Sequence, residues 1–542
     1  MASEMEVIEF PSPPRGKLRI TAIMLALSLS MFVAALDQTI IATAIPTIAA
    51  KFNSAAGYTW IGGAYLLANA AGSCIWAKLS DIWGRKLILL IAVAWFLISS
   101  IICAAAVNMQ MLIAGRALQG IAGGGVLQLN TIIISDLFSV RHRSLYLGLM
   151  EVMWALAGGV GPLLGGAFSE YVTWRWSFWI NPPISGLAFI LLFFYLDVHN
   201  PKTKIADGFK AIDWFGSLSV LGLTLMLLLG LDFGGEAFAW SSPQVICLIV
   251  FGSLCSLIFI YSEKRLAKYP IMPLDIFSHI SNIASLAVGF AHGFVFVAGE
   301  YYIPLYLQSV KGASPLRSGI LILPLVLAEA FSGLITGMVI HRTGRYRELI
   351  WIGLVLMTIG NGLFIRLDAF SSLGEIIGYQ FISGCGAGLL FQTPIIALQA
   401  MVSQDETATA TATLGFIRNM ATACSIVIGG VVFQNSMGER KASLLATGMS
   451  ESLAEQMTGD SAAANIEYIK NIEDPVQLLA VQEAFAWSMR NMWILYTCMS
   501  GLGVIFSLFI LRTRLREEHV ETVTGLNREK QPVIESIQTQ TA

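Results

Sequence analysis

Long apolar segments alternate with short polar ones along most of this chain. Fourteen such segments are each about 20 residues long, which is the length a helix needs to cross a bilayer at a rise of about 1.5 Å per residue. The pattern therefore predicts an all-α integral membrane protein. The predicted spans are 20–44, 58–77, 87–107, 110–134, 145–168, 177–196, 213–231, 244–262, 281–306, 317–340, 349–366, 374–400, 406–435 and 490–511.

Two stretches of the chain repeat at matching places. The basic segment Ala77–Leu89 reads AKLSDIWGRKLIL, and a weaker copy, GMVIHRTGRYREL, lies at Gly337–Leu349, with a spacing of 260 residues. At a spacing of 264, Gly120, Gly124 and Gln128 align with Gly384, Gly388 and Gln392. Repeats of this kind indicate two homologous halves in a membrane. The shift between them equals eight spans, so six-helix halves leave two additional helices in the middle.

The repeat defines five regions. They are a disordered cytoplasmic N-terminus (1–17), an N-terminal six-helix bundle (18–198), two inserted helices with their flanking loops (199–280), a C-terminal six-helix bundle with a long outer loop at 436–489 (281–511) and a cytoplasmic tail (512–542). The outer loop is expected to be a solvated cap containing a short amphipathic helix.

Composition and charge agree with this arrangement. Only 13% of residues are charged, against about 25% in soluble proteins. One set of alternate loops carries twenty Lys and Arg residues and the opposite set nine, which predicts that both termini are cytoplasmic. The sequence contains no Walker or HExxH motif and no metal cluster. We therefore expect no enzymatic activity and no cofactor, with an ion gradient as the energy source.

Charged residues inside predicted spans are costly and point to function. Asp37 and Arg116 lie about 10 Å and 9 Å from the outer ends of their spans, so they could form an ion pair that takes part in proton coupling. A fixed structural pair is the alternative. Glu329 and Arg418 both lie near the midplane and form a second candidate pair. Glu151 is a candidate gate residue.

The fifth span carries a run of glycines around one proline. Its members Gly161, Pro162, Gly165 and Gly166 predict a hinge or a close helix interface. A generic packing face is the alternative. At a spacing of 264, Pro162 aligns with Ile426, so only one half has this proline.

These stretches together resemble the major facilitator superfamily, and within it the fourteen-helix drug:proton antiporters. The stretches that carry the resemblance, over roughly residues 20–511, are Ala77–Leu89, Leu36–Pro46, Gly115–Gly125 and Gly161–Gly166. Ala77 and Ala157 stand where the family has glycine. Phe391–Pro394 and Val432–Asn435 resemble fungal members, many of which export toxins or drugs.

The resemblance implies a mechanism and roles for individual residues. Two bundles would rock around a central cavity, and Asp81, Arg85 and Asp136 would close a cytoplasmic gate. Protonation near Asp37 and Arg116 would drive export of an amphipathic organic molecule. Gln128, Gln392 and Trp154 would line the substrate cavity, although the two glutamines could instead bond neighbouring helices.

The expected partners are a small-molecule substrate, protons and the lipid bilayer. We expect no nucleic-acid partner and a monomer, in the plasma membrane or the vacuolar membrane. An importer of the same superfamily, such as a siderophore transporter, and a membrane sensor that does not transport remain alternatives. A sugar carrier is disfavoured by the short segment before the seventh span.

Overall fold

The computed structural model describes residues 16–41, 43–52, 55–234, 238–458, 469, 472–515, 517–518, 522 and 524–525. Residues 1–15 of the predicted disordered N-terminus and much of the predicted tail lie outside these ranges, while Lys17 begins the first helix. Within the described ranges the regular secondary structure is helical, apart from one isolated bridge between Gly234 and Phe238. The fold class predicted from the sequence is therefore confirmed.

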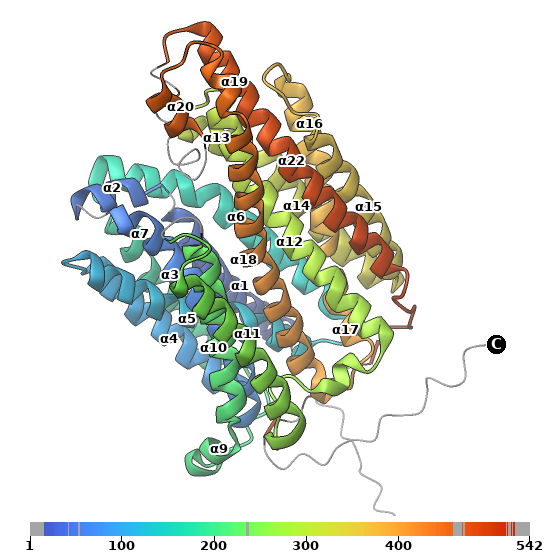
Figure 1. Ribbon diagram of the computed structural model, residues 1–542. Helices are drawn as coiled ribbons and strands as arrows, with labels where there is room; N and C mark the ends of the chain where they lie inside the picture. The colour runs from blue at the N-terminus through green and yellow to red at the C-terminus, as the bar shows by residue number, and fades with distance from the viewer. Residues whose placement is uncertain are drawn as a thin grey trace, which may run out of the picture.

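The helices follow one another with short connections (Figure 1). They are α1 (Lys17–Ile40), α2 (Ile45–Lys51), α3 (Ala55–Trp83), α4 (Arg85–Ala104), α5 (Met109–Leu137), α6 (Val140–Ala167), α7 (Trp176–Trp179), α8 (Asn181–Tyr195), α9 (Ile205–Ala211), α10 (Trp214–Phe233), α11 (Pro243–Tyr261), α12 (Ile280–Ser309), α13 (Pro315–Leu321), α14 (Leu323–Thr343), α15 (Arg347–Phe364), α16 (Leu373–Leu390), α17 (Thr393–Gln399), α18 (Thr407–Glu439), α19 (Lys441–Leu445), α20 (Glu451–Met457) and α22 (Pro475–Ser507).

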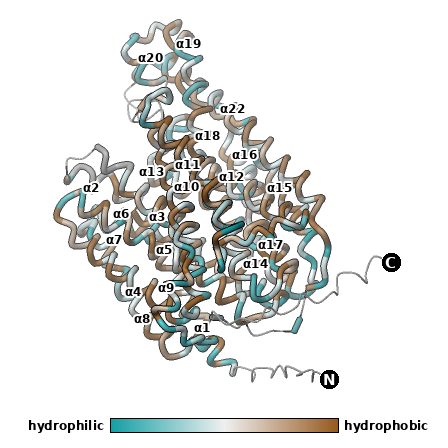
Figure 2. The backbone as a smooth tube through the Cα atoms, turned by 60° about the horizontal axis from the view of Figure 1, so that its bottom comes forward, coloured by the Kyte–Doolittle hydropathy of each residue, from teal (hydrophilic) through white to brown (hydrophobic). Residues whose placement is uncertain are grey.

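Twelve helical stretches in the described residues are long and apolar enough to cross a membrane. Two further helices, α3 and α22, overlap the predicted spans 58–77 and 490–511 but are not among the twelve. The total of fourteen spans thus stays a prediction. Figure 2 shows hydrophobic residues distributed along the long helices, as lipid-facing and packed surfaces require.

The helices of the two halves pack in the same way. In the N-terminal half α1 packs on α6 and α8, while α5 packs on α3 and α4. In the C-terminal half α12 packs on α18 and α22, while α16 packs on α14 and α15. The halves meet where α6 contacts α14 and where α18 contacts α3. Of the inserted pair, α10 contacts both α3 of the N-terminal half and α18 of the C-terminal half, and α11 packs on α10 (Figure 1).

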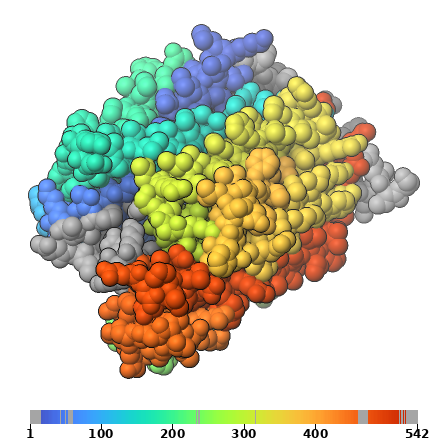
Figure 3. Space-filling model, turned by 90° about the horizontal axis from the view of Figure 1, so that it is seen from above, coloured from blue at the N-terminus to red at the C-terminus, as the bar shows by residue number. Residues whose placement is uncertain are grey.

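Several predicted loops are helical. Helix α3 continues to Trp83, so only Gly84, with φ of 94°, separates it from α4. That backbone conformation suits glycine. Helix α22 begins at Pro475, so the predicted loop 436–489 contains the end of α18, helices α19 and α20 and the start of α22. Figure 3 shows this region projecting beside the rest of the molecule.

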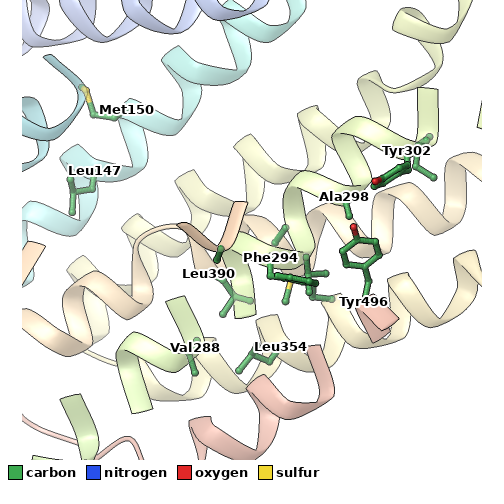
Figure 4. Close-up of a cluster of buried hydrophobic side chains, with 14 of the residues drawn as sticks. Leu147, Met150, Val288, Phe294, Ala298, Tyr302, Leu354, Leu390 and Tyr496 are labelled. Atoms are coloured by element: carbon green, nitrogen blue, oxygen red, sulfur yellow. The ribbon is translucent and has the colours of Figure 1, made fainter. Parts of the chain in front are cut away.

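Apolar residues and hydrogen-bonded tyrosines fill the interior of the C-terminal half. Phe294, Ala298 and Tyr302 follow one another along α12 and face Tyr496 of α22 (Figure 4). The Tyr302 hydroxyl donates to the Ile426 carbonyl at 2.7 Å, and the Tyr496 hydroxyl donates to the Ser425 carbonyl at 2.8 Å. These bonds tie α12 and α22 to α18, because a buried hydroxyl needs a partner.

Candidate functional site

Asp37 on α1 and Arg116 on α5 form an ion pair inside the N-terminal half. Arg116 Nη1 lies 2.5 Å from Asp37 Oδ2, and the two side chains are 1% and 0% exposed. The sequence placed both at similar depths, and the structure brings them into contact. Removing one partner of such a pair would leave a buried charge uncompensated.

The carboxylate of Asp37 has two further donors. Gln119 Nε2 and Asn181 Nδ2 donate to its Oδ1 at 2.7 Å and 2.8 Å. The Ser100 hydroxyl oxygen accepts from the same two amides at 2.8 Å and 3.3 Å. Helices α1, α4, α5 and α8 therefore meet at one charged network. Charge-assisted bonds of this kind are short and strong, so the network fixes the relative positions of the four helices.

Aromatic rings enclose the other side of Arg116. Its guanidinium carbon lies 4.5 Å from the centre of the Tyr65 ring and 5.8 Å from that of Phe178, and its Nε donates to the Ile61 carbonyl at 3.0 Å. A Cβ at Gly120 would overlap the Tyr65 backbone. The glycine thus lets α3 approach α5 closely enough for Tyr65 to reach the guanidinium.

Sequence reasoning missed three members of this network. Gln119 follows Arg116 by three residues and so lies on the same helix face, a spacing that could have identified it. Ser100 and Asn181 come from other helices and carry no comparable signal. At a spacing of 264 the counterpart of Arg116 is Gln380, which is fully buried and whose side-chain N and O atoms have no partner among the described residues.

The glycine–proline run of α6 packs against α1 just beyond Asp37. A Cβ at Gly161 would overlap the Thr39 hydroxyl, and one at Gly165 would overlap the Ile40 carbonyl. The Thr39 hydroxyl donates to the Ala157 carbonyl at 2.9 Å. Gly166 has nothing within 4 Å of its Cβ position. Two of the four predicted motif residues therefore form a close interface, while Pro162 lies inside the continuous helix α6.

We call the end of the bundle that carries Lys78, Arg85 and Arg143 the basic end, and the opposite end the distal end. At the basic end Arg85 joins Asp81 and Asp136, at N–O distances of 2.6 Å and 2.7 Å. Arg85 is 1% exposed. The three predicted gate residues thus form one cluster, although all three belong to the N-terminal half.

Hydrogen bonds cross between the halves at the basic end. Arg143 of α6 donates to Gln399 Oε1 at 2.9 Å and to Gln404 Oε1 at 3.2 Å. Ser144 donates to the Gly337 carbonyl at 3.2 Å, and Arg141 donates to the His341 carbonyl at 2.8 Å. These bonds hold the two halves together at this end.

Contacts between α6 and α14 loosen toward the distal end. A Cβ at Gly148 would lie 3.2 Å from the Gly333 carbonyl oxygen, whereas Cβ atoms at Gly158 and Gly159 would lie 3.7 Å and 3.9 Å from their nearest neighbours on α14. The interface is therefore tightest near the basic end.

Glu329 and Arg418 do not form the candidate midplane pair. Arg418 Nη2 instead donates to the Phe391 carbonyl at 2.9 Å. The acid that interacts electrostatically with Arg418 is Glu151. The charges that act on Glu329 are those of Glu300 and Glu151, and Glu329 Oε1 has no hydrogen-bond partner among the described residues. The sequence predicted that Glu329 and Arg418 lie at similar depths, but their side chains point toward different neighbours.

The predicted cavity residues have different surroundings. Gln392 is 1% exposed and donates to the Gly333 carbonyl at 2.6 Å, so it bonds a neighbouring helix. Gln128 faces Gly415 of the other half, and its Nε2 has no partner within the described structure. Trp154 is half-buried and packs on the apolar cluster between α1 and α6. Of these three residues, Gln128 has a buried donor without a partner in the described structure, and it lies at the interface of the halves.

Comparisons with known proteins agree with this architecture. The sequence profile of the Major Facilitator Superfamily matches residues 27–426. The chain is 47% identical over 511 residues to "Efflux pump dotC" of Dothistroma septosporum, covering 94% of this chain and 87% of that protein. It is 45% identical over 518 residues to "MFS-type transporter ppz2" of Metarhizium majus, covering 96% and 89%.

A solved structure has a similar fold. The human organic anion transporter MFSD10 aligns with a TM-score of 0.57 at 16% identity, covering 89% of this chain and 99% of that one. The family profile and the named relatives, together with two similarly packed helical halves, identify this chain as a membrane transporter. This chain belongs to the Major Facilitator Superfamily.

Proposed function

We propose that this protein exports an amphipathic small organic molecule, such as a toxin, secondary metabolite or drug, in exchange for protons. The observation that carries the proposal is the fully buried Asp37–Arg116 pair. A carboxylate at this depth is costly to maintain, and such residues in membrane helices mark ion pathways. The efflux direction rests on the relative named "Efflux pump dotC", which is 47% identical over nearly the whole chain.

The geometry suggests how a proton is coupled to movement. Asp37 accepts from Arg116, Gln119 and Asn181, and a protonated carboxyl offers fewer acceptor sites than a carboxylate. Protonation therefore weakens the network that joins α1 to α5 and α8. Because Thr39 and Ile40 of α1 pack on Gly161 and Gly165 of α6, a shift of α1 is transmitted to the helix that contacts α14.

The interface between the halves supports alternating access. Hydrogen bonds cross it at the basic end, which the distribution of Lys and Arg assigns to the cytoplasm. On this assignment the described conformation is closed toward the cytoplasm, and the Asp81–Arg85–Asp136 cluster holds the end of α3 against α4 and α5 in the N-terminal half beside these contacts. Gln128 and Trp154 are the candidate substrate contacts, while the bond from Gln392 to Gly333 favours a packing role.

The proposal includes further expectations from the sequence. Both termini are cytoplasmic, the protein is a monomer in the plasma membrane or the vacuolar membrane, and it uses no cofactor. Import by the same fold and sensing without transport are the competing functions. Export, import and sensing differ in whether a compound moves, in which direction it moves and whether protons move with it.

The test uses the full-length protein in liposomes that contain the pH-sensitive dye pyranine. A panel of amphipathic compounds is added one at a time, and movement of compound and of protons is followed together. An exporter moves compound and protons in opposite directions, while an importer coupled to protons moves both in the same direction. Cells that lack this protein should accumulate its substrate. If the reconstituted protein moves none of the compounds that such cells accumulate, the proposal is wrong.

A further inference from the structure

Described residues that follow α22 contact the basic end of the bundle. The first of these residues are fixed to the C-terminal half, because the Tyr346 hydroxyl donates to the Leu511 carbonyl at 2.8 Å and the Leu511 N–H donates to the Ser281 hydroxyl oxygen at 3.1 Å. We call the described residues 508–515, 517–518, 522 and 524–525 the strap. Further along, Glu517 pairs with Arg141 of α6.

The far end of the strap binds the N-terminal half. Thr522 Oγ1 donates to Asp136 Oδ1 at 2.9 Å, and Asp136 is the acid that pairs with Arg85. The Thr524 N–H donates to His199 Nδ1 at 3.1 Å. Thr522 and Thr524 are 5% and 4% exposed. Both side chains are therefore enclosed by protein.

Thr522 is also bonded to the opposite half. Gln404 Nε2 donates to the Thr522 hydroxyl oxygen at 2.9 Å and to the Ser135 carbonyl at 3.3 Å. One hydroxyl thus accepts from the C-terminal half and donates to the N-terminal half. Opening the basic end would require at least one of these bonds to break.

The strap sequence fits its position. Gly525 has φ of 122°, a conformation that residues with a Cβ rarely adopt. Its N–H donates to the Asp81 carbonyl at 2.9 Å, and a Cβ there would lie 2.7 Å from Pro201 Cβ. Glycine is thus the residue that this close approach to Pro201 allows.

We propose that Thr522, Thr524 and Gly525 together form an internal ligand of the basic end, which locks the two halves closed and must leave before that end can open. The binding surface consists of Asp136, His199, Gln404 and the Asp81 carbonyl. This inference rests on the alternating access proposed above. It makes release of the strap a step that limits the rate at which the basic end opens.

The test begins with Thr522→Glu in the full-length protein. The new carboxylate faces Asp136, and like charges repel, so the strap is expelled. The readout is thiol labelling of a reporter, Ser144→Cys, with exposed Cys247 and Cys498 replaced by Ser. Loss of the Thr522 bonds should raise the labelling rate about fivefold or more. Thr343→Glu, at an exposed residue of the same end, is the matched control and should change nothing.

A crosslink provides the second arm. The Thr524 and His199 side chains lie 3.1 Å apart between Oγ1 and Nδ1, so His199→Cys with Thr524→Cys should form a disulfide under oxidation. The linked protein should label slowly and transport slowly, and reduction should restore both rates. Labelling needs no substrate, so it tests the strap even if no compound is transported. Equal labelling rates in the linked, reduced and Thr522→Glu proteins would overturn the inference.

Discussion

Gly161 of α6 contacts Thr39 of α1 so closely that a Cβ at position 161 would overlap the Thr39 hydroxyl. Thr39 follows the buried acid Asp37 by two residues. The part of α1 that adjoins the charged network therefore contacts α6, the helix that faces the other half. Changes at this contact should affect stability and transport together.

Gly161→Ala is expected to push α1 away from α6. Overpacking of a close interface typically costs about 1–3 kcal/mol, so the variant should unfold at a lower temperature in detergent and transport more slowly. Gly166→Ala is the control, because nothing lies within 4 Å of its Cβ position. Equal melting temperatures for the two variants would show that the α1–α6 contact is not tight in the membrane.

Asp37→Asn is expected to abolish transport driven by a pH gradient. The amide oxygen can still accept from Arg116, so the helices stay together, but no proton can be carried. Breaking a buried pair costs about 3–5 kcal/mol when a charge is left alone, so Asp37→Asn with Arg116→Gln serves as the stability control. The double variant should be as stable as the single one or more so, and equally unable to couple. Gradient-driven efflux at the normal rate by Asp37→Asn would refute a proton-carrying role.

The two glutamines should respond differently to substitution. Gln128→Ala removes an unused donor at the interface, so it should raise the compound concentration needed for half-maximal transport while leaving proton coupling intact. Gln392→Ala removes a buried bond to Gly333, which typically costs about 1 kcal/mol, and should lower the melting temperature. If Gln392→Ala instead raised this concentration and Gln128→Ala lowered the melting temperature, the binding site would lie beside Gln392 and α14.

Asp81→Ala is expected to weaken closure of the basic end. Loss of a charge-assisted bond to Arg85 should shift the equilibrium toward the open state by about tenfold, seen as faster labelling of the Ser144→Cys reporter. Asp368→Ala, in a loop at the distal end that the Lys311 side chain contacts through the Ala369 carbonyl, is the control and should leave labelling unchanged. Unaltered labelling in Asp81→Ala together with full transport would exclude this gate.

The sequence predicted how deep the charged residues lie along their helices, but it did not predict the direction in which each side chain points. Counting residues at a fixed rise per residue placed Asp37 beside Arg116, and the structure pairs them. The same count placed Glu329 level with Arg418, but each residue also turns about 100° around its helix, and small errors in span ends change the direction a side chain faces. The two residues consequently have different neighbours.

Contacts contributed by other helices were beyond a single sequence. Asn181 and Ser100 complete the Asp37 network, yet each is one ordinary polar residue with no spacing signal that links it to α1. The sequence predicts only a cytoplasmic tail where the strap lies, because the hydrogen bond from Thr522 to Asp136 depends on a chain path that periodicity does not encode. The predicted spans 58–77 and 87–107 leave residues 78–86 as a loop, whereas Lys78 and Asp81 lie in the last turns of α3.

Gln380 has a consequence for how the two halves divide their work. It occupies the position of Arg116 in the C-terminal half, and its side-chain N and O atoms have no partner among the described residues. Equivalent positions therefore hold one residue of an ion pair in the N-terminal half and a neutral amide in the C-terminal half. Under the coupling proposed above, the C-terminal half has no equivalent of the Asp37–Arg116 pair at this position, so substitutions around Gln380 should leave proton coupling intact.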